Sequence, residues 1–398
     1  MHSTRQITNN LTWVGVNNRR LAMFEGVYPV QNGMSYNSYL LLDEQTVLFD
    51  TVDTAVQDRF LENISHVLGA RQLDYLVMQH IEPDHSASVK AIVQMYPNVT
   101  LVLNAKSANY VKQFYGNMNV NIMLIAEGDT LCTGAHTLRF FMAPMVHWPE
   151  VMVVYDETSG TLFSADAFGL FGALNGRIFA DEANFLRDHL DEARRYYTNI
   201  VGKYGPQVQA LLKKLSTITV KRICPLHGFV WRKNFNEILE PYKLWSSYRP
   251  EETGVVIAYA SVYGGTENAA EILSNKLNEL GIKTVMYDVS VAHSSDIIAA
   301  CFKFSHLVFA APTYNAGVFV TMKAVVADIV AHNLQNREIV LIENGTWAIT
   351  SGKLMEEQFV LCKNFNIVQT VTVKSSVSEE NVLQLEKIAN DIKSNIRE

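Results

Sequence analysis

From residue 255 to residue 396, short apolar segments alternate with amphipathic ones, and this alternation constrains the fold more than any other feature. The apolar segments predict strands at 255–260, 283–289, 305–311, 338–343 and 366–372. The amphipathic segments predict helices at 266–280, 294–301, 319–332, 352–362 and 378–396. Five consecutive strand–helix units predict a doubly wound parallel sheet, whose ligands bind at the carboxyl ends of the strands.

The first 250 residues show a different pattern, with many short strands and a few helices. Strands are predicted at 11–16, 75–78, 138–142, 151–155, 161–164 and 219–223, with a hairpin that pairs 37–42 with 46–49. Helices are predicted at 55–69, 86–96, 184–202 and 206–216. A polar segment, 246–254, contains Pro250 and Gly254 and marks a boundary. We therefore predict a mixed α/β domain over residues 1–250 and a second domain over residues 251–398.

Composition and charge disfavour several classes of protein. The net charge is -7 and no block of consecutive Lys or Arg occurs, which disfavours nucleic acid and anionic membranes as partners. The polar residues after Met1 do not form a secretory signal, and no segment offers the ~20 apolar residues of a membrane span. We expect a cytoplasmic protein. Its four cysteines form no Cys-x-x-Cys pair, so a bound metal would need nitrogen and oxygen ligands.

A loop of small and hydroxyl residues joins the strand at 255–260 to the following helix. Backbone N–H groups and the helix dipole at such a position stabilise a phosphate. The loop lacks the Gly-Lys-Ser/Thr of a triphosphate site and the Gly-x-Gly-x-x-Gly of a dinucleotide site, which favours a phosphate monoester. A simple helix cap is the alternative interpretation. The candidate residues are Ser261, Val262, Tyr263, Gly264, Gly265 and Thr266.

Two further loops follow the third and fourth strands of the same predicted sheet, at the ligand-binding edge. One offers an aromatic face and backbone donors, and the other offers a Trp that could stack on a flat ring. A Trp on a core helix is the alternative, but this Trp follows a glycine in a polar turn. The residues are Pro312, Thr313, Tyr314, Asn315 and Gly317 in one loop, and Asn344, Gly345, Thr346 and Trp347 in the other. The first loop and the five units resemble the flavodoxins, and that resemblance implies FMN.

The segment Gln79–His85 concentrates four potential metal ligands directly after an apolar strand. Alternation in an extended segment would point His80, Glu82 and Asp84 to one side, and Pro83 favours that geometry at Glu82. His85 is the fourth. So many ionisable groups are costly to bury without a cation. An ordinary surface loop is the alternative.

Three more candidates each follow an apolar strand: His147, Asp166 and His227. A lone His is usually a core or surface residue, but several strand ends that deliver such residues suggest convergence on one edge. Seven ligands exceed what one ion requires. We predict His80, Glu82 and His147 on one metal and Asp84, His85 and His227 on another, with Asp166 bridging them.

The ligand spacing resembles the metallo-β-lactamase superfamily, whose motif is His-x-His-x-Asp-His. Here Glu82 replaces the second His, and a carboxylate favours iron over zinc. The His-x-Glu-x-Asp-His variant is that of the flavodiiron proteins, which the chain resembles along nearly its whole length. Further matching stretches are Ser35–Leu40, Asp50–Thr51, Met145–Pro149 and Ser164–Gly169. In the third flavin loop, the family's usual Gly-Ser-x-Gly-Trp is reduced to the Trp alone.

The resemblance implies a metallo-β-lactamase-like αββα sandwich followed by a flavodoxin-like domain. It also implies reduction of dioxygen to water, of nitric oxide to nitrous oxide, or both, at a non-haem diiron site supplied with electrons by FMN. A head-to-tail homodimer, or a dimer of dimers, would bring each flavin to the other chain's irons, with Trp148 beside the junction. A separate carrier such as rubredoxin would supply the electrons.

Other functions stay open at this point. One is a zinc hydrolase of the lactamase type, another is an electron carrier whose first domain serves docking, and a third is a gas sensor. The preference for dioxygen over nitric oxide is open because pocket residues such as Phe24 and Glu25 cannot be ranked. Coordination by His85 is also open, because water displaces the equivalent His in some family members.

Overall fold

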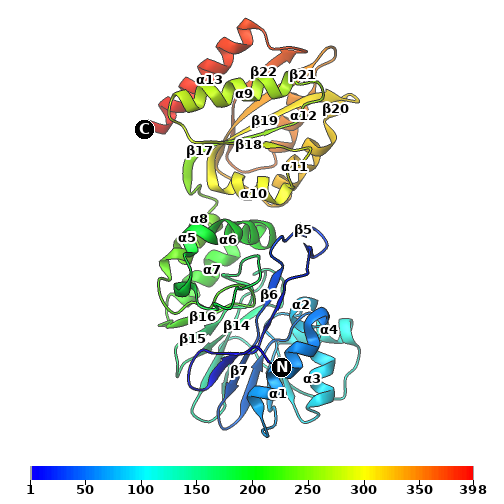
Figure 1. The fold of residues 1–398 in the computed structure, drawn as a ribbon, viewed down its shortest axis with the longest axis vertical. Helices are drawn as coiled ribbons and strands as arrows, with labels where there is room; N and C mark the ends of the chain where they lie inside the picture. The colour runs from blue at the N-terminus through cyan, green and yellow to red at the C-terminus, as the bar shows by residue number, and fades with distance from the viewer. Residues whose placement is uncertain (1, 398) are drawn as a thin grey trace. The chain divides into compact units, whose positions relative to one another are not determined.

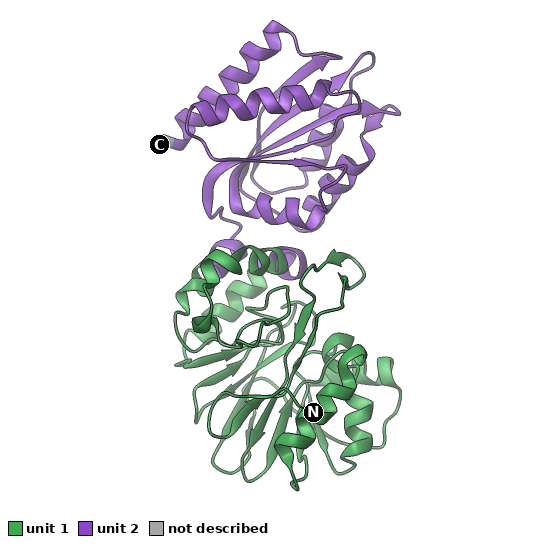
Figure 2. Ribbon diagram, in the orientation of Figure 1, with its two compact units in different colours: residues 1–197, 206–240 green, residues 198–205, 241–398 purple. Residues whose placement is uncertain are grey.

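The structure is a computed structural model that describes residues 2–397, and its chain forms two compact units (Figure 2). Unit 1 contains residues 1–197 and 206–240, and unit 2 contains residues 198–205 and 241–398. Each unit has its own sheets and core and is described by itself. Among the described residues, none of the helices combines the length and hydropathy that a membrane span requires.

Unit 1 contains two main β-sheets (Figure 1). The larger has the order β1 (Arg5–Gln6), β2 (Leu11–Trp13), β7 (Tyr39–Leu42), β8 (Thr46–Phe49), β9 (Tyr75–Val77), β10 (Thr100–Leu103) and β11 (Asn121–Leu124). The smaller has the order β12 (Thr130–Cys132), β13 (Thr137–Met142), β14 (Met152–Asp156), β15 (Thr161–Phe163) and β16 (Arg222–Cys224). The rings of Phe49 and Phe163 stack 3.7 Å apart, so the two sheets pack face to face.

Short helices and two small two-stranded sheets complete the fold of residues 1–250. The helices are η1 (Thr54–Val56), α1 (Gln57–Leu68), α2 (Pro83–Ser86), α3 (Val89–Met95), α4 (Ala105–Tyr115), η2 (Ala180–Glu182), α5 (Phe185–Asp188), α6 (Leu190–Tyr196), α7 (Gly205–Leu215) and α8 (Asn236–Ser246). A π-helical turn, Tyr197–Val201, and η4 (Gly202–Tyr204) follow α6. The small sheets pair β3 (Val16–Asn18) with β6 (Met34–Tyr36), and β4 (Met23–Phe24) with β5 (Tyr28–Pro29).

The predicted elements of residues 1–250 are largely present, but three of them are divided, and β10, β11, β12, α4 and α8 were not predicted. The predicted hairpin is confirmed as β7 and β8. The predicted strand 11–16 is divided between β2 and β3, and the predicted helix 86–96 is divided between α2 and α3. The predicted helix 184–202 is also divided, because it breaks at His189 and widens into the π-helical turn.

Unit 2 is built on a parallel sheet with the order β18–β17–β19–β21–β22. Its strands are β17 (Glu252–Tyr259), β18 (Thr284–Asp288), β19 (Phe304–Tyr314), β21 (Arg337–Gly345) and β22 (Phe365–Lys374), and β20 (Gly317–Val318) pairs with the end of β19. The helices are α9 (Gly265–Glu279), α10 (Ser294–Lys303), α11 (Val320–Ala331), α12 (Ser351–Phe359) and α13 (Glu379–Arg397). The predicted doubly wound parallel sheet is confirmed.

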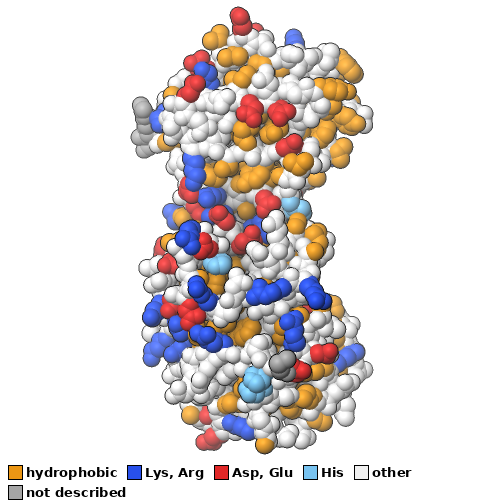
Figure 3. Space-filling model, viewed as in Figure 1, with side chains coloured by type: hydrophobic (Ala, Val, Ile, Leu, Met, Phe, Trp, Pro, Cys, Tyr) orange, Lys and Arg blue, Asp and Glu red, His pale blue; other side chains and the backbone are white. Residues whose placement is uncertain are grey.

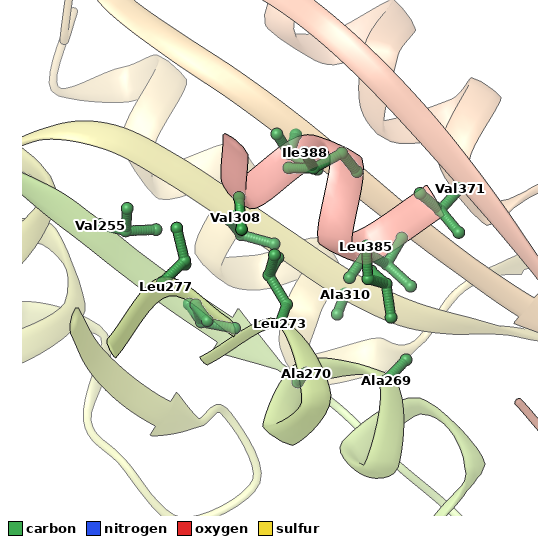
Figure 4. Packing of buried hydrophobic residues seen from close by; sticks show 14 of the residues in the cluster. Val255, Ala269, Ala270, Leu273, Leu277, Val308, Ala310, Val371, Leu385 and Ile388 are labelled. Carbon is green, nitrogen blue, oxygen red and sulfur yellow. The ribbon is translucent and has the colours of Figure 1, made fainter. Parts of the chain in front are cut away.

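Burial of apolar side chains holds α9 and α13 against one face of this sheet (Figure 4). Leu273 and Leu277 of α9 and Leu385 of α13 meet Val255 and Val308 of the central strands. All five side chains are fully buried, which is the dominant stabilising contribution to such a fold. On the face drawn in Figure 3, basic and acidic side chains are mixed.

Candidate metal centre and flavin loops

Pro83 determines how the Gln79–His85 segment presents its side chains. Glu82 is extended, with φ -55° and ψ 138°, and Pro83 occupies the first position of α2, where its missing N–H is not needed. The prediction that His80 and Glu82 point to one side is confirmed, since His80 Nε2 lies 3.1 Å from Glu82 Oε2. The extended geometry predicted at Asp84 is wrong, because the chain is helical from Pro83 onward, and Asp84 Oδ2 lies 3.3 Å from His85 Nε2.

The structure brings the seven predicted ligands together in two groups. The donor atoms within each group lie within 4.8 Å of one another. One group is His80, Glu82, His147 and Asp166, and the other is Asp84, His85 and His227.

Asp166 lies between the groups and turns one oxygen to each. Its Oδ2 lies 3.4 Å from His80 Nε2 and 3.2 Å from His147 Nε2. Its Oδ1 lies 3.1 Å from His85 Nε2 and 3.8 Å from His227 Nε2. This is the arrangement of a carboxylate that can bridge two cations.

Several of these donor atoms are buried without a hydrogen-bond partner among the described residues. They include both carboxylate oxygens of Asp84, both ring nitrogens of His85, His227 Nε2 and Asp166 Oδ1. Among them, Asp84 Oδ2 and Asp166 Oδ1 lie 3.3 Å and 3.1 Å from His85 Nε2, and Asp84 Oδ2 lies 3.2 Å from His227 Nε2, so these four atoms converge on one point. A buried polar atom left unpaired costs roughly 1–3 kcal/mol, and a cation at that point would remove the cost. The residues therefore fit a pair of metal ions held by nitrogen and oxygen.

Two buried acidic residues that sequence reasoning did not assign a role support the ligands. Glu150 Oε1 lies 2.8 Å from His80 Nδ1 and accepts a hydrogen bond from the Ile81 amide. Asp50 Oδ1 accepts hydrogen bonds from the amides of Gln79 and His80. Such outer contacts fix ring orientation and direct Nε2 towards a metal. Glu150 follows His147 by three residues in an irregular loop, where no periodic pattern marks it.

Three residues with unusual backbone dihedral angles lie next to the candidate ligands and help to orient them. Asp50, Met145 and Ala165 have φ of 54°, 64° and 50°, in the left-handed region that residues other than glycine rarely adopt. All three lie beside the ligand segments, and such conformations cost roughly 1–3 kcal/mol each. Strain of this size at three neighbouring turns is typical of a functional site.

The ionisable groups of the centre perturb one another strongly. Burial alone would lower the pKa of His147, but hydrogen bonds with Asp166 and Glu82 outweigh it and raise that pKa to about 9. Burial would raise the pKa of Glu82, but hydrogen bonds from His147 and His80 hold it well below its usual value. When no cation is bound, protonated histidines therefore balance the negative charge of the carboxylates. A bound metal would displace these protons and take over their charge.

Aromatic rings enclose one side of the centre. Phe24 stands edge-on to the His227 ring at 5.5 Å, and Tyr36 lies 5.8 Å from that ring. The neighbouring Glu25 sits at the tip of the β4–β5 hairpin with φ 51°. Its burial and the adjacent Glu82 raise the pKa of Glu25 to about 8. Trp148 lies on the other side, 5.2 Å from the His80 ring.

In unit 2, the first of the loops predicted to bind a flavin joins β17 to α9. Gly264 caps the helix with φ 85°, and its amide donates to Ser261 Oγ at 3.1 Å. A Cβ on Gly265 would lie 2.1 Å from the carbonyl oxygen of Ser375, so only glycine allows this close approach. The first amides of α9 have no acceptor within the helix and suit a phosphate. Thr266, in the same turn, is buried.

Large aromatic side chains stand exposed at the same edge of the sheet. Tyr263, after β17, is 98% exposed; Trp347, after β21, is 81% exposed; and Tyr314, the last residue of β19, is 44% exposed. Clustered exposed apolar side chains mark a ligand or interaction site. The other predicted residues of these loops are Val262, Pro312, Thr313, Asn315, Gly317, Asn344, Gly345 and Thr346.

A fourth segment, after β22, belongs to this edge and was missed by sequence reasoning. Asn344 donates to the Ser375 carbonyl oxygen at 3.3 Å, and the Thr346 and Ser375 hydroxyls lie 2.9 Å apart. Only its place at the end of the last strand could have identified Ser375. The residues of the four segments fit a phosphate and a flat aromatic ring.

Comparisons with known proteins agree with this geometry. Residues 34–228 match the family model described as ODP family beta lactamase. A protein of Methanocaldococcus jannaschii, MJ0732, is 30% identical over 79% of this chain and 78% of that protein. The nitric oxide reductase of Moorella thermoacetica is 28% identical over 90% of each chain. The solved rubredoxin oxygen:oxidoreductase of Desulfovibrio gigas is 25% identical, with a TM-score of 0.92, over 99% of this chain and 98% of that one.

The fold and the matches define a metallo-β-lactamase-like domain fused to a flavodoxin-like one, as predicted. The chain belongs to the flavodiiron protein family, which confirms the resemblance inferred from the sequence.

Proposed function

We propose that this protein is an oxidoreductase that reduces dioxygen to water, nitric oxide to nitrous oxide, or both, at a non-haem diiron site with electrons relayed by FMN. One observation carries the proposal: seven buried nitrogen and oxygen ligands form two groups with Asp166 between them. The names of the M. thermoacetica and D. gigas proteins support this class of reaction.

In this proposal, His80, Glu82 and His147 hold one iron, Asp84, His85 and His227 hold the other, and Asp166 bridges them. Bound iron would supply electrons one at a time and stabilise negative charge that develops on the substrate. The side chains of Glu82, Asp84 and His147 are 13%, 11% and 9% exposed, whereas His80 and Asp166 are buried. The former therefore form the accessible edge of the site, while Phe24 and Tyr36 exclude water beside His227.

FMN would be held by the loops Ser261–Thr266, Pro312–Gly317 and Asn344–Trp347. The amides at the start of α9 would bind its phosphate, and Tyr263, Tyr314 and Trp347 offer aromatic surfaces to its ring. Residues 1–250 would then carry the metals and residues 251–398 the flavin.

A partner chain completes the proposed electron path. Because the two cofactors belong to separate units, we propose a head-to-tail homodimer, alone or as a dimer of dimers, in which each flavin serves the other chain's irons. A small redox carrier such as rubredoxin would reduce the flavin in the cytoplasm. This chain also matches a Vibrio vulnificus protein named anaerobic nitric oxide reductase flavorubredoxin, and the matched region covers 64% of that protein's length.

Metal analysis and gas consumption test the proposal together. Protein purified without chelators should contain iron and FMN, and once reduced it should consume dioxygen or nitric oxide in sealed-cell electrode assays. His80→Ala should lose iron and turnover but keep flavin, whereas Trp347→Ala should keep iron and bind flavin a few fold more weakly. Zinc in place of iron, with no gas consumption, would reject the proposal in favour of a lactamase-type hydrolase.

A further inference from the structure

Unit 1 contains a cavity of about 920 Å³ that includes none of the predicted metal ligands. Charged and amide side chains, among them Arg19, Asn32 and Glu192, line part of it. Its apolar lining includes Leu170, Phe171 and Phe229. The first two follow the segment that carries Asp166, and the third follows His227.

The segments that carry the candidate ligands Asp166 and His227 also supply apolar side chains to the cavity wall. Phe229 lies two residues after His227, so one short loop supplies a ligand and a wall of the cavity. Leu170 packs on the same loop, because a Cβ on Gly228 would lie 2.7 Å from Leu170 Cγ. The Phe171 ring lies 5.7 Å from the Phe24 ring, which in turn stands 5.5 Å from His227. A thin layer of side chains therefore separates the cavity from the metal centre.

Phe171 holds a defined position in that layer. The Arg195 guanidinium lies over its ring at 4.6 Å, and the Tyr196 ring stands edge-on at 5.2 Å. Arg195 also donates to the Pro29 carbonyl oxygen at 2.9 Å, which ties it to the β4–β5 hairpin. The ring thus closes the layer in this structure, and a gas molecule would pass only when thermal motion displaces the ring.

A separate entrance is needed if electrons arrive at the accessible edge of the centre. Glu82, Asp84 and His147 form that edge, and a flavin placed there for short-range transfer would cover it. We propose that the cavity beside Phe171 admits the gas substrate, and that Phe171 is the gate to the His227 side of the metal centre. This inference rests on the proposed function, because it takes a small diatomic gas as the substrate.

Opposite changes in side-chain size at Phe171 test the gate. Iron-loaded, reduced full-length protein is mixed with nitric oxide in a stopped-flow instrument, and the association rate is followed by absorbance. Because rate depends exponentially on barrier height, we expect association about tenfold faster in Phe171→Leu and about tenfold slower in Phe171→Trp. The amount of nitric oxide bound at equilibrium should not change, since neither variant alters a ligand.

Leu174→Ala is the matched control. Leu174 lines the same cavity, but its backbone is bound to Asn17 and Arg19, and within the described chain it makes no ring or polar contact with the layer formed by Phe171 and Phe24. Nitric oxide should associate with Leu174→Ala at the same rate as with the unmodified protein. A xenon-pressurised crystal provides a readout independent of iron, because an apolar atom should occupy a site that adjoins Phe171 and Leu170. This measurement and Phe171→Leu decide the matter if Phe171→Trp does not fold.

The outcomes separate the two proposals. Equal association rates in Phe171→Leu, Phe171→Trp and the unmodified protein would overturn the gate, even with normal nitric oxide binding. No xenon beside Phe171 would count against it in the same way. Failure of the iron-loaded unmodified protein to bind or consume either gas would instead overturn the proposed function.

Discussion

The candidate metal centre of unit 1 and the proposed flavin loops of unit 2 are built in different ways. The metal centre uses buried side chains from distant segments, and several of their polar atoms lack a partner within the described chain. The flavin loops use backbone amides and exposed aromatic rings at one edge of a sheet. The first design depends on the chemical identity of each side chain, and the second depends mainly on the path of the backbone. Substitutions should therefore act more severely in the first.

The largest effect is expected for Asp166→Ala, which removes the carboxylate shared by both groups. Iron content should fall to near zero and gas reduction should fall by more than the ~10–100-fold typical of outer residues, while flavin stays bound. Metal analysis and absorbance spectra measure both cofactors. Asp391→Ala, on the surface of α13, is the control. Full iron retention in Asp166→Ala would contradict the assignment.

Glu150→Gln should have the next largest effect, because it weakens the contact that orients His80. Metal affinity should fall ~10–100-fold, as for other residues that support a ligand, and competition with a chelator measures it. Glu150→Asp should restore part of the affinity if the carboxylate acts by charge. Glu157→Gln, on the surface beside Arg139, should change nothing.

Acidification should weaken metal binding and leave flavin binding largely unchanged. The pKa of His147 is raised to about 9 in the metal-free centre, so a metal must displace its proton at every lower pH. Metal affinity should rise with pH up to about 9. Below that pH, each proton that the metal displaces should lower the affinity about tenfold per pH unit. Chelator competition at pH 6, 7 and 8 tests this, and a flat profile would contradict it.

Gly265→Ala should affect only the flavin. Its Cβ would clash with the Ser375 carbonyl oxygen, so the phosphate loop must move and flavin affinity should fall about tenfold, equivalent to 1.4 kcal/mol. Fluorescence titration with FMN measures the change. Gly281→Asn, after the end of α9, is the matched control, because Asn tolerates its left-handed φ of 72° and its Cβ would meet no atom within 4 Å.

The smallest effect is expected for Trp347→Ala. The side chain is 81% exposed and contributes little to folding, so the melting temperature should not change. Flavin affinity should fall by a few fold, by roughly the 0.5–1.5 kcal/mol of one aromatic contact. A loss of iron in this variant would contradict the division of roles between the two regions.

The sequence predicted most of the architecture, because apolar periodicity reports which face of an element is buried. The strands and helices of residues 255–396 agree with the structure to within a few residues, and β19 runs on to Tyr314 because β20 pairs with it. Breaks were harder to foresee. The helix predicted at 184–202 divides at His189, where no proline or glycine marks the change.

The members of the candidate site could be predicted from the types of residue, because His, Asp and Glu are recognisable metal ligands. Features that depend on backbone conformation or on contacts between distant segments could not be predicted. Ligand residue types at strand ends identified all seven members of the two groups. The helical conformation of Asp84 was missed because Pro83 begins a helix instead of prolonging the extended segment. Glu150 and Ser375 act through single contacts from distant parts of the chain, and such contacts leave no local pattern.

The position of Asp166 has a consequence for how the centre assembles. Since each of its oxygens faces a different group, a cation captured on one side fixes the carboxylate for the other side. The second ion would then meet a donor that is already immobilised and would bind more readily than the first. Titration with ferrous ion should therefore be sigmoidal, with singly occupied molecules scarce at every intermediate stoichiometry.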